Sequence, residues 1–108
     1  MGEKDFQSSI EQAIDELEEA FSRLADDRDI DIEVEGGVLT ITFEEGEPGK
    51  FIVSPNSAAK QMWVSARVSS FKFDLAEAGF TLAGTGEPLR DVMTRLVRDQ
   101  LGDQTVTL

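Results

Sequence analysis

The chain has 108 residues, of which 22 are acidic and 10 basic, so its formal net charge is −12; it has no cysteine and no histidine. This composition excludes disulfides, zinc–thiolate and iron–sulfur ligation, cysteine nucleophiles and histidine-based catalysis, and it disfavours nucleic acid and anionic membranes as partners. The length and a hydrophobic content of 40% predict one globular domain over residues 1–108.

The negative charge is concentrated in the first half of the chain. Residues 1–47 hold 16 of the 22 acidic side chains and three of the ten basic ones, a net charge of −13. No apolar run approaches the ~20 residues of a membrane span. The start of the chain is acidic rather than basic and then apolar, so it lacks the pattern of a signal peptide. We therefore expect a cytoplasmic protein.

The first predicted element is an amphipathic helix. Its apolar residues recur at spacings of three and four: Phe6, Ile10, Ile14, Leu17, Phe21 and Leu24. Asp5 or Ser8 is a candidate N-cap, and Ser8 with Glu11 has the spacing of a capping box. The side chains away from the apolar stripe are rich in carboxylates, and an acidic run over 26–29 leads out of the helix.

A hairpin and four further strands follow. Hydrophobic residues alternate with acidic ones over 30–35, Gly36-Gly37 suits a tight turn, and Leu39, Ile41 and Phe43 point inward on the returning strand over 38–43. Further strands are predicted over 51–54, 61–67, 71–74 and 80–82, with turns at 55–59 and 69–70.

A second helix over 88–101 closes the chain, with Thr85 as the predicted N-cap and Gly102 as the stop. Helices at both ends with strands between them predict an α+β fold, a two-layer α/β sandwich. Each helix has one apolar stripe, so both should pack on one face of an antiparallel sheet of about five to six strands. The other face of the sheet should be open to solvent.

Trp63 is the single tryptophan of the chain. A lone tryptophan in a strand is more often part of the core. However, Trp63 shares its side of the strand with Gln61, Ser65 and Arg67, whereas Met62, Val64 and Ala66 take the other side. This alternation favours an exposed tryptophan on a polar sheet face, which is a candidate protein-binding hot spot.

Two stretches resemble the frataxin family, and its bacterial CyaY branch in particular. They read DIDIEVEGGVLTITF over 29–43 and KQMWVS over 60–65, and the similarity extends from about Asp5 to the end of the chain. The resemblance implies a small α/β sandwich that binds iron weakly through an acidic ridge. It also implies docking to the cysteine desulfurase and the scaffold protein of iron–sulfur cluster assembly.

The resemblance also implies which residues act. The metal-binding candidates are Glu11, Asp15, Glu18, Glu19, Asp26, Asp27, Asp29, Asp31 and Glu33. Gln61 and Trp63 match the partner-docking residues of the family, Asn56 and Lys72 match them more loosely, and Arg67 lies on the same side of its strand. Ser22, Arg23 and Ala25 stand where bacterial relatives usually carry further acidic residues.

Carboxylate oxygens accept iron in either oxidation state and also other divalent cations. Dispersed, solvated carboxylates predict weak and poorly selective binding, roughly micromolar or weaker. We therefore expect a non-enzymatic, iron-binding accessory protein that is monomeric without iron. The alternatives are a general iron-buffering or storage protein that oligomerises with iron, a metal-free acidic docking module, and an acidic face that only solvates the protein. The sequence offers no support for a ferroxidase.

Overall fold

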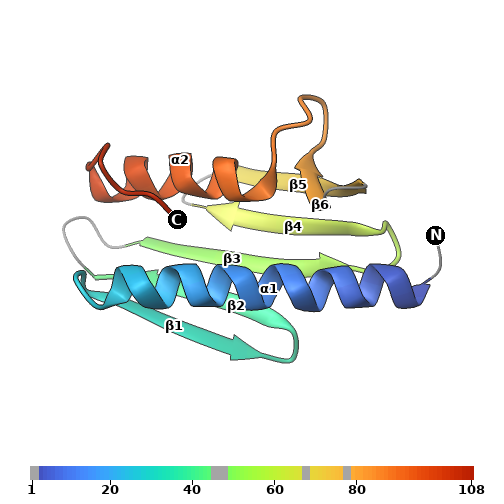
Figure 1. The fold of residues 1–108 in the computed structure, drawn as a ribbon, viewed down its shortest axis with the longest axis horizontal. Coiled ribbons are helices and arrows are strands. Elements are labelled where there is room, and N and C mark those ends of the chain that lie inside the picture. The colour runs from blue at the N-terminus through green and yellow to red at the C-terminus, as the bar shows by residue number, and fades with distance from the viewer. Residues whose placement is uncertain (1–2, 45–48, 67–68, 77–78) are drawn as a thin grey trace.

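The computed structural model describes residues 3–44, 49–66, 69–76 and 79–108, and this part of the chain forms two helices and a six-stranded sheet (Figure 1). The elements in chain order are α1 (Glu3–Ala25), β1 (Ile30–Glu35), β2 (Val38–Phe43), β3 (Gly49–Asn56), β4 (Gln61–Ala66), β5 (Ser69–Ala76), β6 (Gly79–Leu82) and α2 (Leu89–Leu101).

The sheet is an antiparallel meander in which the spatial order of the strands is their order along the chain. Short connections permit only antiparallel neighbours, because a parallel pair needs a long crossover. β1 and β6 are therefore the two edge strands. Both helices lie over the same face of the sheet (Figure 1), and the opposite face has no covering layer among the described residues. The predicted fold class is confirmed.

The core lies between the helices and the sheet. It is built from the apolar stripes of both helices and the inward residues of every strand; its largest fully buried side chains are Phe6, Phe21, Phe43, Phe51, Phe73, Ile10, Leu39, Ile41, Met62, Met93, Val53 and Val64. Burial of one such side chain is worth about 1.5–3 kcal/mol. The rings of Phe43 and Phe51 lie 4.7 Å apart, and Phe6 meets Phe80 edge-on at 6.1 Å. The second contact joins the start of α1 to β6.

The helix termini differ from the prediction at both N-terminal ends. α1 begins at Glu3, so Asp5 and Ser8 lie inside it and the predicted cap and capping box are wrong. Residues 3 and 4 are good helix formers, which lets the helix extend back beyond Phe6. α2 takes Pro88 as its N-cap, and Thr85 lies in the preceding turn. The stop at Gly102 is confirmed by its left-handed φ of 65°.

The predicted turns at 55–59 and 69–70 are partly wrong, because Pro55 and Asn56 belong to β3, and Ser69 and Ser70 belong to β5. Proline lacks the N–H that a central strand needs. Pro55 is nevertheless tolerated, because the β2–β3 pairing ends at Val53. In β5, pairing with β4 overrides the turn preference of the two serines. β4 ends at Ala66, and Arg67 lies outside the described residues.

Candidate functional site

The outer face of α1 carries four of the predicted metal-binding residues. Glu11, Asp15 and Glu19 are exposed and Glu18 is half-buried. Glu19 accepts a hydrogen bond from Arg23 at 3.0 Å in an exposed ion pair of i,i+4 spacing. Arg23 therefore neutralises the charge of one helix carboxylate. It does so in the last part of the helix, where Ser22, Arg23 and Ala25 take the place of further acidic residues.

The loop from α1 to β1 brings further acids toward the end of β2. Asp26 and Asp27 are exposed, and their N–H groups bond to the carbonyls of the last helical turn. The Glu44 N–H then donates to the Asp29 carbonyl at 3.0 Å, which extends the hairpin by one pair beyond Ile30 and Phe43. Glu44 is thereby held beside Asp29.

Asp29, Asp31 and Glu44 form what we call the acidic corner. Repulsion from Asp31, then from Asp29, raises the pKa of Glu44 above its ordinary value of 4.5, and desolvation and a hydrogen bond to Asp29 act in the same direction. Glu44 was not among the predicted site residues. The hairpin register could have identified it, because the outward pairs Glu33–Thr40 and Asp31–Thr42 lead on to Asp29 and Glu44.

Within the described residues, no group of three or more acidic side chains is arranged to hold a metal ion. The predicted metal-binding residues are instead distributed over the helix face, the connecting loop and the outer side of β1, where Glu33 is also exposed. Their oxygens suit hard cations. The geometry is one of dispersed, mostly exposed carboxylates, and resolved repulsion is confined to Glu44 in the acidic corner.

Trp63 lies on the open sheet face and is 39% exposed, so the prediction from strand alternation is confirmed. Its indole Nε1–H donates to Gln61 Oε1 at 3.0 Å, and Gln61 Nε2 donates to Asp74 Oδ1 at 2.9 Å. Lys72, which is paired with Trp63 across β4 and β5, holds its ammonium 5.1 Å from the centre of the indole ring. We call Gln61, Trp63, Lys72 and Asp74 the tryptophan patch. Asp74 was not predicted.

The remaining predicted docking residues have other positions. Asn56 is half-buried at the end of β3, where its Oδ1 accepts a hydrogen bond from the Ala59 N–H at 3.1 Å and closes the turn to β4. Arg67 lies outside the described residues. Ile52, which sequence reasoning missed, is 37% exposed on the same sheet face as Trp63. The sheet face thus presents two large hydrophobic side chains.

The acidic side of β1 and the tryptophan patch belong to one continuous surface. Glu33 is paired with Thr40, Thr40 with Ile52, and Ile52 with Ser65, two residues from Trp63 on the same side of β4. At about 4.8 Å between neighbouring strands, β1 and β4 are roughly 15 Å apart. A single partner surface of ordinary size can therefore cover both regions.

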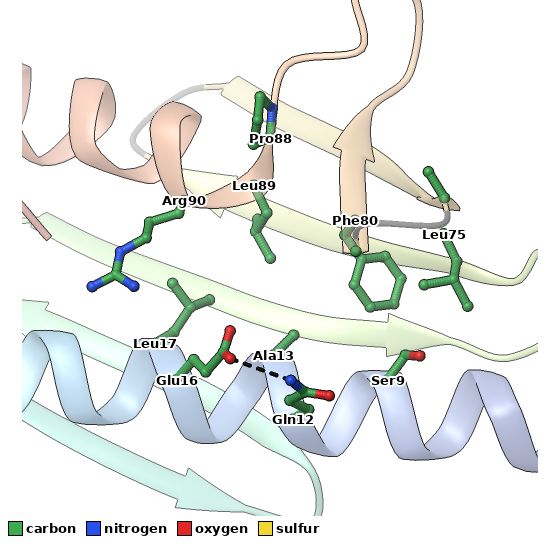
Figure 2. Close-up of a pocket in the computed structure, with 12 residues that line it drawn as sticks. Ser9, Gln12, Ala13, Glu16, Leu17, Leu75, Phe80, Pro88, Leu89 and Arg90 are labelled. Carbon is green, nitrogen blue, oxygen red and sulfur yellow. Dashed lines mark hydrogen bonds between the residues drawn. The ribbon is translucent and has the colours of Figure 1, made fainter.

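A groove of about 360 Å³ opens on the helix side of the molecule, between α1, β5, β6 and α2 (Figure 2). Its floor includes Leu17, Phe80 and Leu89, and its rim carries Glu16 and Arg90. Glu16 accepts a hydrogen bond from Gln12 at 3.4 Å. None of the predicted site residues lines this groove.

Among the described residues, no helix is both long enough and apolar enough to cross a membrane.

The chain matches known proteins over most of its length. Residues 1–103 match the family model of the frataxin-like domain. The chain is similar to two bacterial proteins named iron-sulfur cluster assembly protein CyaY. The one from Pseudomonas aeruginosa is 35% identical over 107 residues, covering 95% of this chain and 94% of the relative. The one from Stutzerimonas stutzeri is 34% identical over 94 residues, covering 83% and 84%.

The fold is also similar to a solved structure, the frataxin from Psychromonas ingrahamii. The two structures superpose with a TM-score of 0.83 over 95% of this chain and 94% of the other, at 18% sequence identity. At that identity the match speaks for the fold, and it agrees with the sandwich described above.

Proposed function

Because the chain belongs to the frataxin-like family, we propose that it is a non-enzymatic accessory protein of iron–sulfur cluster assembly. The proposal rests on two relatives that are named iron-sulfur cluster assembly proteins and that match this chain over most of their length. It is consistent with a chain that has no cysteine or histidine with which to build a cluster or a nucleophilic site.

We propose that the open sheet face docks onto the complex of cysteine desulfurase and scaffold protein. The observation that carries this part is the exposure of Trp63 on the open sheet face, beside the exposed Ile52, where the indole N–H is already bonded within the protein. Tryptophan is enriched among interface hot spots. The carboxylates of β1, on the same face, would steer the approach of a basic patch on the partner.

Iron is the proposed cargo of the acidic corner and the outer face of α1. The repulsion that Glu44 experiences from Asp31 and Asp29 supports this, since a cation close to Glu44 would reduce it. The carboxylates are dispersed and exposed, so the binding is weak, roughly micromolar or weaker, and poorly selective among hard cations.

A second candidate is a metal-free docking module. It is favoured by the lack, within the described residues, of any acidic group arranged as a metal site. The third candidate, an iron-storage protein, requires oligomerisation around iron. Light scattering with and without ferrous iron separates storage from the other two, because a chain that stays monomeric cannot enclose a store.

An NMR titration tests the proposal directly. The labelled chain is titrated first with ferrous iron and then with the desulfurase and scaffold proteins. Iron should shift the amides of residues 29–33 and 44 and those around the acidic residues of the outer face of α1. The partners should shift the amides of β4 and β5. Shifts from the partners alone would favour the metal-free module, and no shift from the partners at low salt would refute docking.

A further inference from the structure

Trp63 is held by a chain of hydrogen bonds that begins at Asp74 on the neighbouring strand. Asp74 Oδ1 accepts from Gln61 Nε2 at 2.9 Å, and Gln61 Oε1 accepts from Trp63 Nε1–H at 3.0 Å. Gln61 and Asp74 are directly paired across β4 and β5. The regular pairing of the two strands therefore places Asp74 and Gln61 within hydrogen-bonding distance of each other.

In this series of hydrogen bonds, the donor and acceptor of each bond are fixed by the chemistry of the three side chains. An ionised carboxylate only accepts hydrogen bonds and an indole N–H only donates them, whereas an amide does both at opposite ends. Asp74 thus selects the orientation of the Gln61 amide in which the NH₂ points toward β5. That orientation turns the amide oxygen toward Trp63.

Lys72 restricts the indole from another side. Its ammonium lies 5.1 Å from the ring centre, at a distance where the attraction to the π face is significant. The indole is thus held by its nitrogen and by its ring while 39% of the side chain remains exposed. An interface residue that is fixed before binding loses less rotamer freedom when the partner arrives.

We propose that Asp74 is a positioning residue for docking, which acts through Gln61 to fix the orientation of Trp63. This inference rests on the proposed docking function of the sheet face. Because the Nε1–H is already used within the protein, the partner contacts the ring surface of Trp63 and not its N–H. Asp74 itself need not touch the partner.

The test exchanges the amide at position 61 and the carboxylate at position 74, so that donor and acceptor trade places between the two side chains. Gln61→Glu keeps the acceptor for the indole but places two carboxylates against each other. Asp74→Asn alone keeps an acceptor for Gln61. In the double variant, the amide introduced at position 74 donates to the carboxylate introduced at position 61, which still accepts from the indole. The double variant also keeps the net charge of the parent. Asp91→Asn, on the exposed surface of α2, controls for the loss of one negative charge in Asp74→Asn. Gln104→Glu, at an exposed position after α2, controls for the gain of one negative charge in Gln61→Glu.

The first readout uses the free protein, in which Trp63 is the single tryptophan. Exchange of the indole N–H with solvent and fluorescence anisotropy report how firmly the ring is held. Gln61→Glu should speed the exchange and lower the anisotropy, whereas the double variant should return both to parental values. If the double variant stays as perturbed as Gln61→Glu, or if Gln61→Glu changes neither signal, the positioning role of Asp74 is wrong.

The second readout is the affinity for the desulfurase and scaffold complex. Gln61→Glu should weaken it by roughly threefold to tenfold, the usual effect of one disrupted hydrogen bond, and the double variant should recover it. An affinity that stays weakened in the double variant, or that falls equally when one negative charge is added by Gln104→Glu, would overturn the positioning role. If the parent chain does not bind the complex, the proposed function fails, while the first readout still decides whether Asp74 orients the indole.

Discussion

The acidic corner and the tryptophan patch lie on one sheet face and use carboxylates in opposite ways. At the acidic corner, Asp29 and Asp31 raise the pKa of Glu44 because like charges face one another. In the tryptophan patch, Asp74 has a hydrogen-bond donor in Gln61 and organises its neighbours. In the first region like charges repel one another, and a nearby cation or basic partner would reduce that repulsion. The second is already satisfied and presents a fixed shape.

This difference separates two properties that net charge alone would merge. A repulsive cluster should govern how binding and stability respond to salt, metal and pH. An ordered hydrophobic anchor should govern how tightly a partner is held once it has arrived. The following changes should affect one region and spare the other.

The largest effect should come from Trp63→Ala. If the indole is a hot spot, its loss weakens docking to the desulfurase and scaffold complex by about 30-fold or more. Because the side chain is already 39% exposed, the melting temperature should fall by no more than a few degrees. Isothermal titration calorimetry and a thermal melt measure the two quantities. Val34→Ala is the matched control, since Val34 is 40% exposed but lies at the far end of β1. An affinity within threefold of the parent would remove Trp63 from the interface.

A smaller effect on docking should follow charge reversal at Asp29, Asp31 and Glu33. Replacing all three by lysine should lower the affinity by roughly tenfold at low salt, and the difference should shrink at high salt because the attraction is screened. The free variant should melt no lower than the parent, since Glu44 then faces cations. A loss of affinity that is independent of salt would contradict the steering role.

Cations should stabilise the free protein by a few degrees in melting temperature. Moderate salt screens the acidic corner, and millimolar divalent cation should stabilise the fold further if, as proposed, it binds there more tightly than to the unfolded chain. Scanning calorimetry in increasing NaCl, MgCl₂ and ferrous iron measures this rise, and Glu44→Gln should reduce it. A melting temperature that is flat across all conditions would mean that the acidic corner is not strained. Much greater stabilisation by iron than by calcium would indicate a specific site.

The smallest effects should appear in the pH dependence of two single variants. The raised pKa of Glu44 means that the folded state holds its proton more readily than the unfolded chain, so ionisation of Glu44 costs stability at neutral pH. Glu44→Gln should therefore raise the melting temperature at pH 7 by roughly one or two degrees. The gain should vanish as the pH falls through the raised pKa toward 4.5.

Asp103 should behave with the opposite sign and serves as the control for Glu44→Gln. Hydrogen bonds from the Thr105 hydroxyl and N–H, and then the Arg28 guanidinium, lower the pKa of Asp103 below its ordinary value of 3.8. Its ionised form stabilises the fold above that value, and this contribution is lost as the pH falls through the lowered pKa. Asp103→Asn should thus lower the melting temperature at pH 7, and this loss should shrink as the pH falls through the lowered pKa. A change in melting temperature of the same sign at pH 7 for Glu44→Gln and Asp103→Asn would contradict the opposite pKa shifts of the two groups.

The sequence alone was sufficient to predict the layers of the fold and to place most of the acidic side chains on exposed faces. Helical and alternating spacing predicted both helices, all six strands and the exposure of Trp63, because these patterns follow directly from burial on one side. Strand ends were predicted less well. Pro55 and Ser69 favour turns locally, and their strand conformation depends on where β2 ends and on pairing with β4.

Two of the residues that sequence reasoning missed, Glu44 and Asp74, show where it reached its limit. Glu44 required only one more step along the hairpin register, since Gly36-Gly37 fixes which residues face one another. Asp74 required the register between β4 and β5, and the connection between those strands has no turn motif that determines it. The hydrogen-bond chain to Trp63 therefore became visible only in three dimensions.

The position of β1 at the edge of the sheet has a further consequence. Among the described residues no strand lies beyond its outer backbone groups, which could therefore pair with another copy of the chain, as edge strands do in aggregation. Asp31, Glu33 and Glu35 surround this edge with negative charge. Two copies therefore repel each other where they could most readily join. The β1 carboxylates proposed to steer a partner would thus also keep two copies of the chain apart.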